Sequence, residues 1–160
     1  MSNKPYSLIT REAALSSSDC AGLRELIESK KVRLTPLRES VYNFVSHAKE
    51  KGISAYQILE LMKKYKPNAK PATVYRSLDY LQQAGIIVKI ECCSKFIRKN
   101  NLSSDIVTLF LICSSCGTII QHTDHLIHTC IEKKAIDYGC AVLKKDIEVK
   151  VICPDCRRKG

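Results

Sequence analysis

Two pairs of cysteines constrain the fold of this 160-residue chain more than any other feature of its sequence. Cys113 and Cys116 form one Cys-x-x-Cys pair, Cys153 and Cys156 form a second, and 36 residues separate the pairs. The two-residue spacing lets both sulfurs of a pair face one ion, and four thiolates suit tetrahedral zinc. Buried structural cysteines or one redox dithiol are alternatives, but a redox motif does not need the second pair. The spacing therefore predicts a structural Zn²⁺ site on these four residues.

The compartment expected for this chain is a reducing one. The N-terminal stretch never assembles an apolar core of signal-peptide length, because Arg11, Glu12, Asp19 and Arg24 interrupt it. The longest apolar run, residues 106–113, is far too short to span a bilayer. We therefore expect a cytoplasmic protein with no membrane partner. Nine cysteines in such a compartment favour metal ligation over a disulfide framework, and their odd number argues against complete pairing.

Positive charge is concentrated in the middle of the chain. Residues 30–99 hold fifteen Lys or Arg against five Asp or Glu, which is a net charge of +10, whereas the rest of the chain holds eleven of each sign. A solvated basic face is the usual fate of scattered lysines. Segregation of the whole excess into one segment favours instead a module that binds a polyanion such as nucleic acid.

The basic segment has the pattern of three helices followed by a hairpin. Thr35 followed by Pro36 is typical of a helix start, Ser54 with Gln57 fits a capping box, and Gly85 ends the last helical pattern. Apolar residues spaced three and four apart continue each helix. The pattern predicts helices over residues 36–47, 54–65 and 71–84, followed by short strands over residues 86–90 and 95–99.

Thr73, Tyr75 and Arg76 lie in the first turns of the third expected helix. A helical N-terminus can approach a DNA phosphate with its backbone amides while its side chains enter a groove. An ordinary solvated first turn is the alternative interpretation. Three helices and a basic hairpin make a winged helix-turn-helix, so we expect residues 1–99 to form a DNA-binding domain. Its N-terminus is expected to be flexible, with one more amphipathic helix over residues 19–30.

A second, smaller domain is expected over residues 106–160, after a hinge at residues 100–105. Its pattern predicts strands over residues 106–112, 119–120 and 147–152, with a helix over residues 124–138 between the last two. So small an α/β unit needs the metal for folding, and its apolar first strand indicates a buried sheet or a dimer interface. The expected fold class is α+β: an N-terminal winged helix-turn-helix followed by a small α/β zinc-binding dimerisation domain.

Taken together, these features resemble the ferric uptake regulator family of bacterial metalloregulators, and within it most closely the zinc uptake regulators. The resemblance covers roughly residues 23–156. It rests on Arg33-Leu34-Thr35-Pro36-x-Arg38, Ser54-Ala55-Tyr56, Lys70-Pro71-x-Thr73-Val74-Tyr75-Arg76-x-Leu78-Asp79-x-Leu81, Gly85 and the two cysteine pairs. It implies a homodimer with a structural zinc that, when loaded with metal, represses metal-uptake genes at palindromic double-stranded operator DNA. By motif, Tyr75 and Arg76 resemble recognition-helix contacts, and Arg33 resembles a contact to the DNA backbone.

The chain departs from this family at the positions of a second, sensing zinc. Zinc regulators usually hold that zinc at the hinge with His, Cys, His and Glu, and the corresponding positions here are Val88, Lys99, Ile106 and Gln121. None of these side chains is a good zinc ligand, so the conventional sensing site is expected to be absent. A metal-independent or redox-responsive regulator that keeps only the structural zinc is therefore the alternative to a metal-gated repressor.

Other potential metal ligands lie outside the two cysteine pairs. A relocated regulatory site could use His122, His125 or His128, since the last two are about one helical turn apart, although histidines on a polar helix face are more often simply solvated. Asp124, Cys92, Cys93, Cys130 and Cys140 are further potential ligands. The adjacent Cys92 and Cys93 at the expected hairpin turn could respond to oxidation, but accessible cysteines of this kind more often have no role.

Three classes of function can be compared on these features. A DNA-binding repressor explains the segregated charge, the order of helices and the cysteine pairs together. A zinc-ribbon RNA-binding protein explains the charge and the zinc but not the three helices before a hairpin, and a thiol oxidoreductase explains the cysteines alone. No Ser-His-Asp set, phosphate loop or pair of catalytic carboxylates stands out, which disfavours an enzyme. We therefore expect a sequence-specific transcriptional regulator, with zinc-uptake genes as its targets.

Overall fold

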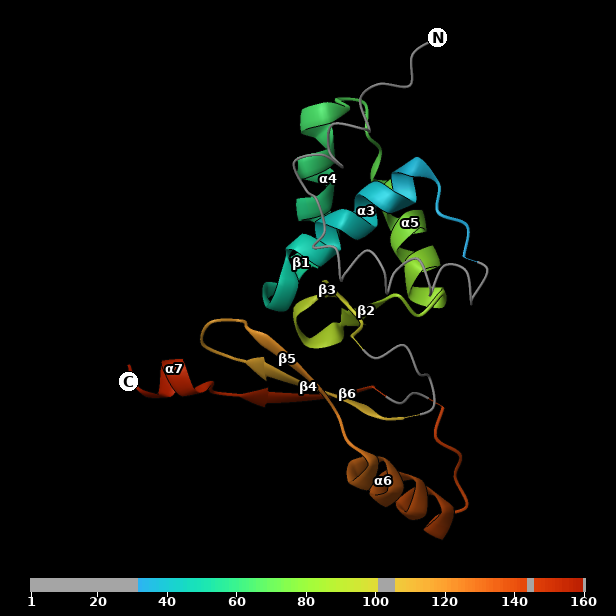
Figure 1. The fold of residues 1–160 in the computed structure, drawn as a ribbon, viewed down its shortest axis with the longest axis vertical. Coiled ribbons are helices and arrows are strands. Elements are labelled where there is room, and N and C mark those ends of the chain that lie inside the picture. The colour runs from blue at the N-terminus through green and yellow to red at the C-terminus, as the bar shows by residue number, and fades with distance from the viewer. Residues whose placement is uncertain (1–31, 101–105, 144–145, 160) are drawn as a thin grey trace. The chain divides into compact units, whose positions relative to one another are not determined.

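The computed structural model describes residues 32–100, 106–143 and 146–159. The chain divides into two compact units, Met1–Lys99 and Asn100–Gly160 (Figure 1). Each unit contains helices and its own three-stranded sheet, so the fold class is α+β as predicted. The expected flexible N-terminus with its helix, and residues 101–105 of the expected hinge, lie outside the described residues.

Three helices make up most of the first unit: α3 (Pro36–His47), α4 (Ala55–Tyr65) and α5 (Pro71–Gln83). The side chain of Thr35 accepts a hydrogen bond from the Arg38 N–H and caps α3. A complete capping box between Ser54 and Gln57 begins α4. The three predicted helices are therefore confirmed, because their starting signals are local in the sequence.

Apolar side chains from all three helices meet in one core. The most deeply buried are at most 1% exposed: Val41, Val45, Ile58, Val74, Leu78 and Leu81. Each of these positions lies on the apolar stripe that the sequence predicts for its helix. Burying this stripe leaves the opposite face of α5, with its polar side chains, toward solvent.

The wing of the first unit is an antiparallel sheet with the strand order β1-β3-β2. The predicted hairpin consists of β2 (Ile87–Ile90) and β3 (Lys95–Arg98), joined by a 3-10 turn (Glu91–Cys93). Its third strand, β1 (Ile53–Ser54), pairs with β3 and was not predicted. A two-residue strand has too little sequence to show an alternating pattern, so only the tertiary pairing reveals it. A second 3-10 turn (Lys49–Lys51) precedes it.

The second unit is built on β4 (Thr108–Cys113), which lies between β5 (Ile119–Thr123) and β6 (Asp146–Val151). Strand β5 pairs with β4 antiparallel, whereas β6 pairs with it in parallel, from Thr108 opposite Asp146 to Cys113 opposite Val151. The apolar strand predicted over residues 106–112 is thus the centre of a sheet, and it begins two residues later than expected. The parallel register brings the end of β4 beside the end of β6.

Between β5 and β6 the chain forms α6 (His125–Asp137), and a single short turn of helix, α7 (Pro154–Arg157), follows β6. The Asp124 side chain caps α6, because its Oδ1 accepts hydrogen bonds from the Leu126 and Ile127 N–H groups. No residue of α6 is buried. Among the described residues no helix is long and apolar enough to cross a membrane.

Candidate metal centre and nucleic-acid interface

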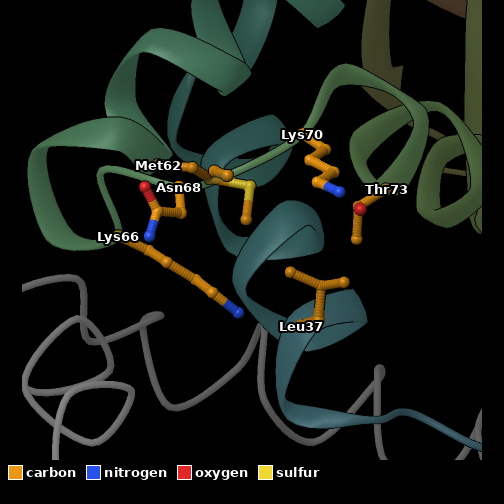
Figure 2. A pocket seen from close by; sticks show the side chains of 7 residues that line it. Leu37, Met62, Lys66, Asn68, Lys70 and Thr73 are labelled. Atoms are coloured by element: carbon orange, nitrogen blue, oxygen red, sulfur yellow. The ribbon is translucent and has the colours of Figure 1, made fainter.

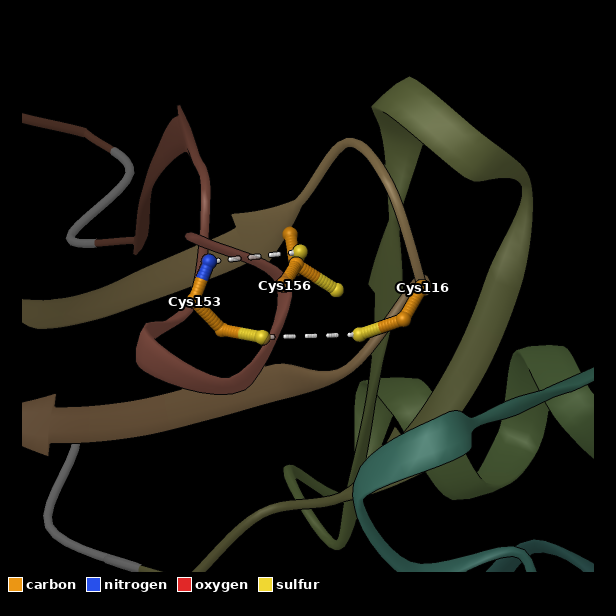
Figure 3. A group of neighbouring side chains, drawn as sticks. Cys116, Cys153 and Cys156 are labelled. Carbon is orange, nitrogen blue, oxygen red and sulfur yellow. Dashed lines mark hydrogen bonds between the residues drawn. The ribbon is translucent and has the colours of Figure 1, made fainter. Parts of the chain in front are cut away.

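The four paired cysteines converge in the second unit. Cys113 is the last residue of β4, and Cys116 follows in the turn to β5. Cys153 is the N-cap of α7, and Cys156 lies within that short helix. Their four Sγ atoms all lie within 4.8 Å of one another, and the Cys116 and Cys153 sulfurs are 3.7 Å apart (Figure 3). The sequence predicts that the two distant pairs face a common centre, and the pairing of β4 with β6 brings them together in this way.

Backbone hydrogen bonds hold the first cysteine pair in a tight turn. The Gly117 N–H donates to the Cys113 carbonyl at 2.8 Å, and the Cys113 N–H donates to the Thr118 carbonyl at 2.9 Å. Gly117 adopts a φ of 70°, a left-handed conformation that glycine reaches without steric cost. The Ser114 N–H bonds to the Val151 carbonyl at 2.8 Å, which connects this turn to the end of β6. The turn therefore presents its two sulfurs toward α7.

The surroundings of the sulfurs favour negative charge at one of them and oppose it at another. Backbone N–H groups of Cys153, at 3.3 Å, and of Cys116 lower the pKa of the Cys113 thiol to about 6. At Cys153 the Cys156 N–H favours the thiolate, but burial and the neighbouring thiols outweigh it and raise the pKa to about 11. Neighbouring thiolates repel one another. A divalent cation among the sulfurs would offset that repulsion and favour deprotonation of the thiols that bind it.

The dimensions of the cluster fit zinc. A tetrahedron of sulfurs with Zn–S bonds of about 2.3 Å has edges of about 3.8 Å. The 3.7 Å separation of the Cys116 and Cys153 sulfurs matches one such edge, and the 4.8 Å limit on the whole set leaves only a small contraction to be made. Four soft thiolates in this geometry select zinc over oxygen-preferring cations such as magnesium.

The histidines after the first cysteine pair are not gathered around one centre. Among the described residues, the cysteine cluster is the one group of three or more His, Cys, Asp or Glu whose ligand atoms lie within mutual reach. His122 Nε2 lies 3.6 Å from Asp124 Oδ2, so these two residues form a pair. The pKa of Asp124 is lowered chiefly by the Ile127 and Leu126 N–H groups that it caps, and further by His122. Within one chain, a relocated site on His122, His125 and His128 is thus not assembled.

Three of the positions aligned with the family's sensing ligands, Val88, Lys99 and Gln121, take part in packing or hydrogen bonds within their own unit. Val88 is 6% exposed in β2 and pairs with Ile97. The Gln121 side chain accepts a hydrogen bond from the Asn100 N–H at 3.2 Å. Lys99 extends the wing, since its N–H donates to the Ile86 carbonyl at 2.9 Å. Apolar packing and backbone pairing therefore occupy positions where the family resemblance implies ligands.

The second potential site is the exposed face of α5. Thr73, Tyr75 and Arg76 are all exposed in its first two turns, and the Tyr75 side chain is 53% accessible. Val74 and Leu78 on the opposite face hold the helix in the core, which leaves the phenol and guanidinium accessible to a large ligand. Arg33, which precedes α3, is exposed as well.

A shallow cavity of about 210 Å³ lies beside the start of α5 (Figure 2). Its lining combines apolar side chains with two lysines of the turn between α4 and α5: Leu37, Met62, Lys66, Asn68, Ala69, Lys70 and Thr73. Both lysines belong to the basic segment of residues 30–99, where charge alone does not distinguish them from the other lysines. Their position next to the N-terminus of α5 adds positive charge where the helix dipole already favours an anion.

Comparison with known proteins identifies the family. The profile described as the ferric uptake regulator family matches residues 29–150, which is more than half of the chain. The chain belongs to the ferric uptake regulator family. The matched residues contain the whole winged helix and the first cysteine pair of this family member, and the second pair lies just beyond them.

Individual relatives agree with this assignment. The zinc uptake regulation protein of Escherichia coli is 30% identical over 85% of this chain and 80% of its own length. The ferric uptake regulation protein of Bacillus subtilis is 24% identical over 86% of this chain and 93% of its own. A solved structure of a zinc uptake regulator in complex with zinc and DNA superimposes with a TM-score of 0.78 at 25% identity, covering 99% of this chain and 98% of that one.

Proposed function

We propose that this chain is a DNA-binding transcriptional regulator that acts as a homodimer and represses zinc-uptake genes. The observation that carries the proposal is the exposed set Thr73, Tyr75 and Arg76 at the start of α5, within the segment of residues 30–99 that holds the net positive charge of the chain. The similar zinc uptake regulator was solved with zinc and DNA, and the E. coli relative is named for regulating zinc uptake. The proposal gives the chain no enzymatic activity and a cytoplasmic location, where operator DNA is found.

In this proposal α5 is the recognition helix and enters the major groove. Arg76 would read a base edge, because a guanidinium donates two hydrogen bonds to guanine, and Tyr75 would contact a base or the sugar. Thr73 and the N-terminal amides of α5 would bind a phosphate. Arg33 would contact the DNA backbone, so that phosphate contacts position the helix and base contacts supply the specificity.

The four paired cysteines would hold one structural zinc in each chain. The thiolates of the turn after β4 and those of α7 would then be joined through a shared tetrahedral ion, which would tie together the adjacent ends of β4 and β6 in the sheet of the second unit. The ligands would be the four thiolates of Cys113, Cys116, Cys153 and Cys156. The Cys153 N–H also donates a hydrogen bond to the Cys113 sulfur, which stabilises negative charge there. Metal binding in so small a unit contributes directly to its folding.

The second unit would supply the dimer interface. A helix of thirteen residues with no buried side chain gains little stability on its own, because short helices depend on packing. Apolar side chains on and after α6 are strongly exposed, including Leu126 at 77%, Ile136 at 70% and Tyr138 at 81%. A second copy of the chain would cover them, and two-fold symmetry would place two recognition helices on two half-sites.

We further propose that a second zinc does not gate DNA binding in this protein. The support is the set of side chains at the conventional sensing positions, where Val88 is buried within the wing and the Gln121 side chain accepts from the Asn100 N–H. A hydrocarbon side chain offers no lone pair to a metal. Regulation would then depend on some signal other than free zinc, while the structural zinc stays bound.

A selection experiment tests the DNA-binding proposal without knowledge of the operator. The purified, zinc-loaded protein is incubated with a library of random duplexes, and bound duplexes are recovered and sequenced over several rounds. We expect enrichment of an inverted repeat, because a two-fold dimer reads the same half-site twice. The Arg76→Ala variant should enrich a weaker or altered motif. Recovery of no common sequence by the wild-type protein would contradict the proposal.

A further inference from the structure

Arg33, the proposed backbone contact ahead of α3, is held by two residues from different helices. The Arg38 side chain in α3 donates from its Nη1 to the Arg33 carbonyl at 3.0 Å. The Tyr80 hydroxyl in α5 accepts a hydrogen bond from the Arg33 N–H, also at 3.0 Å. Both backbone hydrogen-bonding groups of Arg33 are therefore bonded to side chains, which restricts the backbone from which its exposed side chain extends.

The two holding residues also contact each other. The guanidinium carbon of Arg38 lies 3.4 Å from the centroid of the Tyr80 ring, which is a close cation–π contact. A guanidinium suits this place better than an ammonium, because it can stack flat on the ring and still donate hydrogen bonds from its edge. Arg33, Arg38 and Tyr80 thus form a closed triangle of three contacts between the entrance of α3 and the side of α5.

Tyr80 connects this triangle to the proposed recognition surface. It lies four residues after Arg76 in α5, so the two side chains occupy neighbouring positions on one helix face. Arg76 is exposed, whereas Tyr80 and Arg38 are half-buried. Any shift of Arg33 relative to Arg76 would have to break the stacked pair or one of the two hydrogen bonds.

We propose that Arg38 and Tyr80 are positioning residues, which set the place of the Arg33 charge relative to Arg76 so that one residue meets a phosphate while the other reads a base. The proposal rests on the proposed DNA-binding function and adds residues that act through Arg33. It differs from a direct phosphate contact by Arg38, because the half-buried guanidinium is turned to the ring and to the Arg33 carbonyl.

The salt dependence of DNA binding separates positioning from simple structural support. Each phosphate contact contributes about 0.9 to the slope of log K against log salt concentration for duplex DNA. Tyr80→Phe keeps every charge and the aromatic ring and removes only the hydroxyl that accepts from the Arg33 N–H. A loss of slope in this variant therefore reports a lost phosphate contact elsewhere, whereas partial unfolding would lower the active fraction and leave the slope unchanged.

The experiment measures affinity and salt slope for a duplex selected by the wild-type protein. The variants are Tyr80→Phe, Arg38→Lys, Arg33→Ala and the double variant of Tyr80→Phe with Arg33→Ala. Tyr65→Phe is the matched control, since it removes an exposed hydroxyl at the end of α4, away from the proposed contacts. We expect Tyr80→Phe to weaken binding roughly two- to tenfold, the range of one hydrogen bond, with a slope reduced by up to about 0.9. Arg38→Lys should do the same, and Tyr80→Phe should add nothing when Arg33 is already alanine.

Three results would overturn the positioning role. The first is that Tyr80→Phe and Arg38→Lys keep the wild-type affinity and salt slope. The second is that Tyr80→Phe weakens binding equally with and without the Arg33 side chain. The third is that Arg33→Ala itself binds as the wild type does. In each case a wild-type protein that binds its selected duplex leaves the DNA-binding function intact. Failure of the wild-type protein to bind any duplex would instead overturn the function and the positioning role together.

Discussion

The sulfurs of Cys116 and Cys153 lie 3.7 Å apart although they are 37 positions apart in the chain. The parallel pairing of β4 with β6 produces this contact, because it ends both strands at the same edge of the sheet. Zinc at this edge would connect the first strand of the second unit with its last helix. With zinc bound, the cysteine cluster would therefore crosslink the unit whose exposed helix is proposed to bind a second copy.

Loss of one of these cysteines should remove the metal and destabilise the second unit. We expect Cys113→Ser or Cys153→Ser to lose close to one equivalent of zinc per chain and to unfold at lower temperature, because metal binding is coupled to folding. Cys140→Ser, which changes an exposed cysteine outside the cluster, should retain both. Elemental analysis and thermal unfolding measure the two effects. Wild-type zinc content in the cluster variants would contradict the assignment.

Removal of the Arg76 guanidinium should weaken operator binding. We expect Arg76→Ala to lose about 1–3 kcal/mol of binding free energy and to discriminate less at the base pair it contacts. Arg158→Ala is a suitable control, because Arg158 forms an exposed ion pair with Asp155 in the other unit and such pairs contribute little. Fluorescence anisotropy with the selected duplex and its single-base variants measures both effects. Unchanged affinity and specificity would exclude α5 as the reading helix.

A charge on the exposed apolar surface of α6 should dissociate the dimer. Leu126 is 77% exposed in the single chain, and a carboxylate buried there by a partner would have to be desolvated. We therefore expect Leu126→Glu to raise the dimer dissociation constant at least tenfold, whereas Lys133→Glu on the same helix tests the effect of charge alone. Sedimentation velocity over a range of concentrations gives the constants. A Leu126→Glu protein that stays dimeric would place the interface elsewhere.

Operator affinity should change little as free zinc varies, provided that the cysteine cluster stays loaded. The side chains of Val88, Lys99, Ile106 and Gln121 offer neither imidazole, thiolate nor carboxylate ligands. A titration of operator binding against buffered zinc checks this expectation. A large, reversible gain in affinity with a second equivalent of zinc would contradict it, and loss of that gain in His125→Ala would place a relocated site on α6.

Local signals allowed much of the first unit to be predicted from the sequence. The cap at Thr35, the capping box at Ser54 and the proline at the start of α5 each act within four residues, so the helix starts follow from them. The zinc cluster is predictable for a different reason. The spacing of the cysteines predicts which sulfurs can bind one ion, even though the sequence does not show which strands bring the two pairs together.

Features that depend on distant pairing could not be predicted. The parallel register of β6 on β4 and the short strand β1 arise from contacts between separate segments. Arg38 and Tyr80 are 42 positions apart in sequence, and their stacking joins two helices without any local pattern that marks it. That His122, His125 and His128 do not form a group around one centre belongs to the same class, since the helical spacing of His125 and His128 alone would permit a shared ligand site.

The most direct test of this account compares one selected operator sequence in three forms: as duplex DNA, as single-stranded DNA and as single-stranded RNA. Affinity, stoichiometry and salt slope are measured for the zinc-loaded wild-type protein with each form. The account predicts two chains per duplex, an affinity for the duplex at least a hundredfold above that for either single strand, and a steep loss of binding with added salt. Equal or tighter binding of the RNA strand, or binding insensitive to salt, would contradict it.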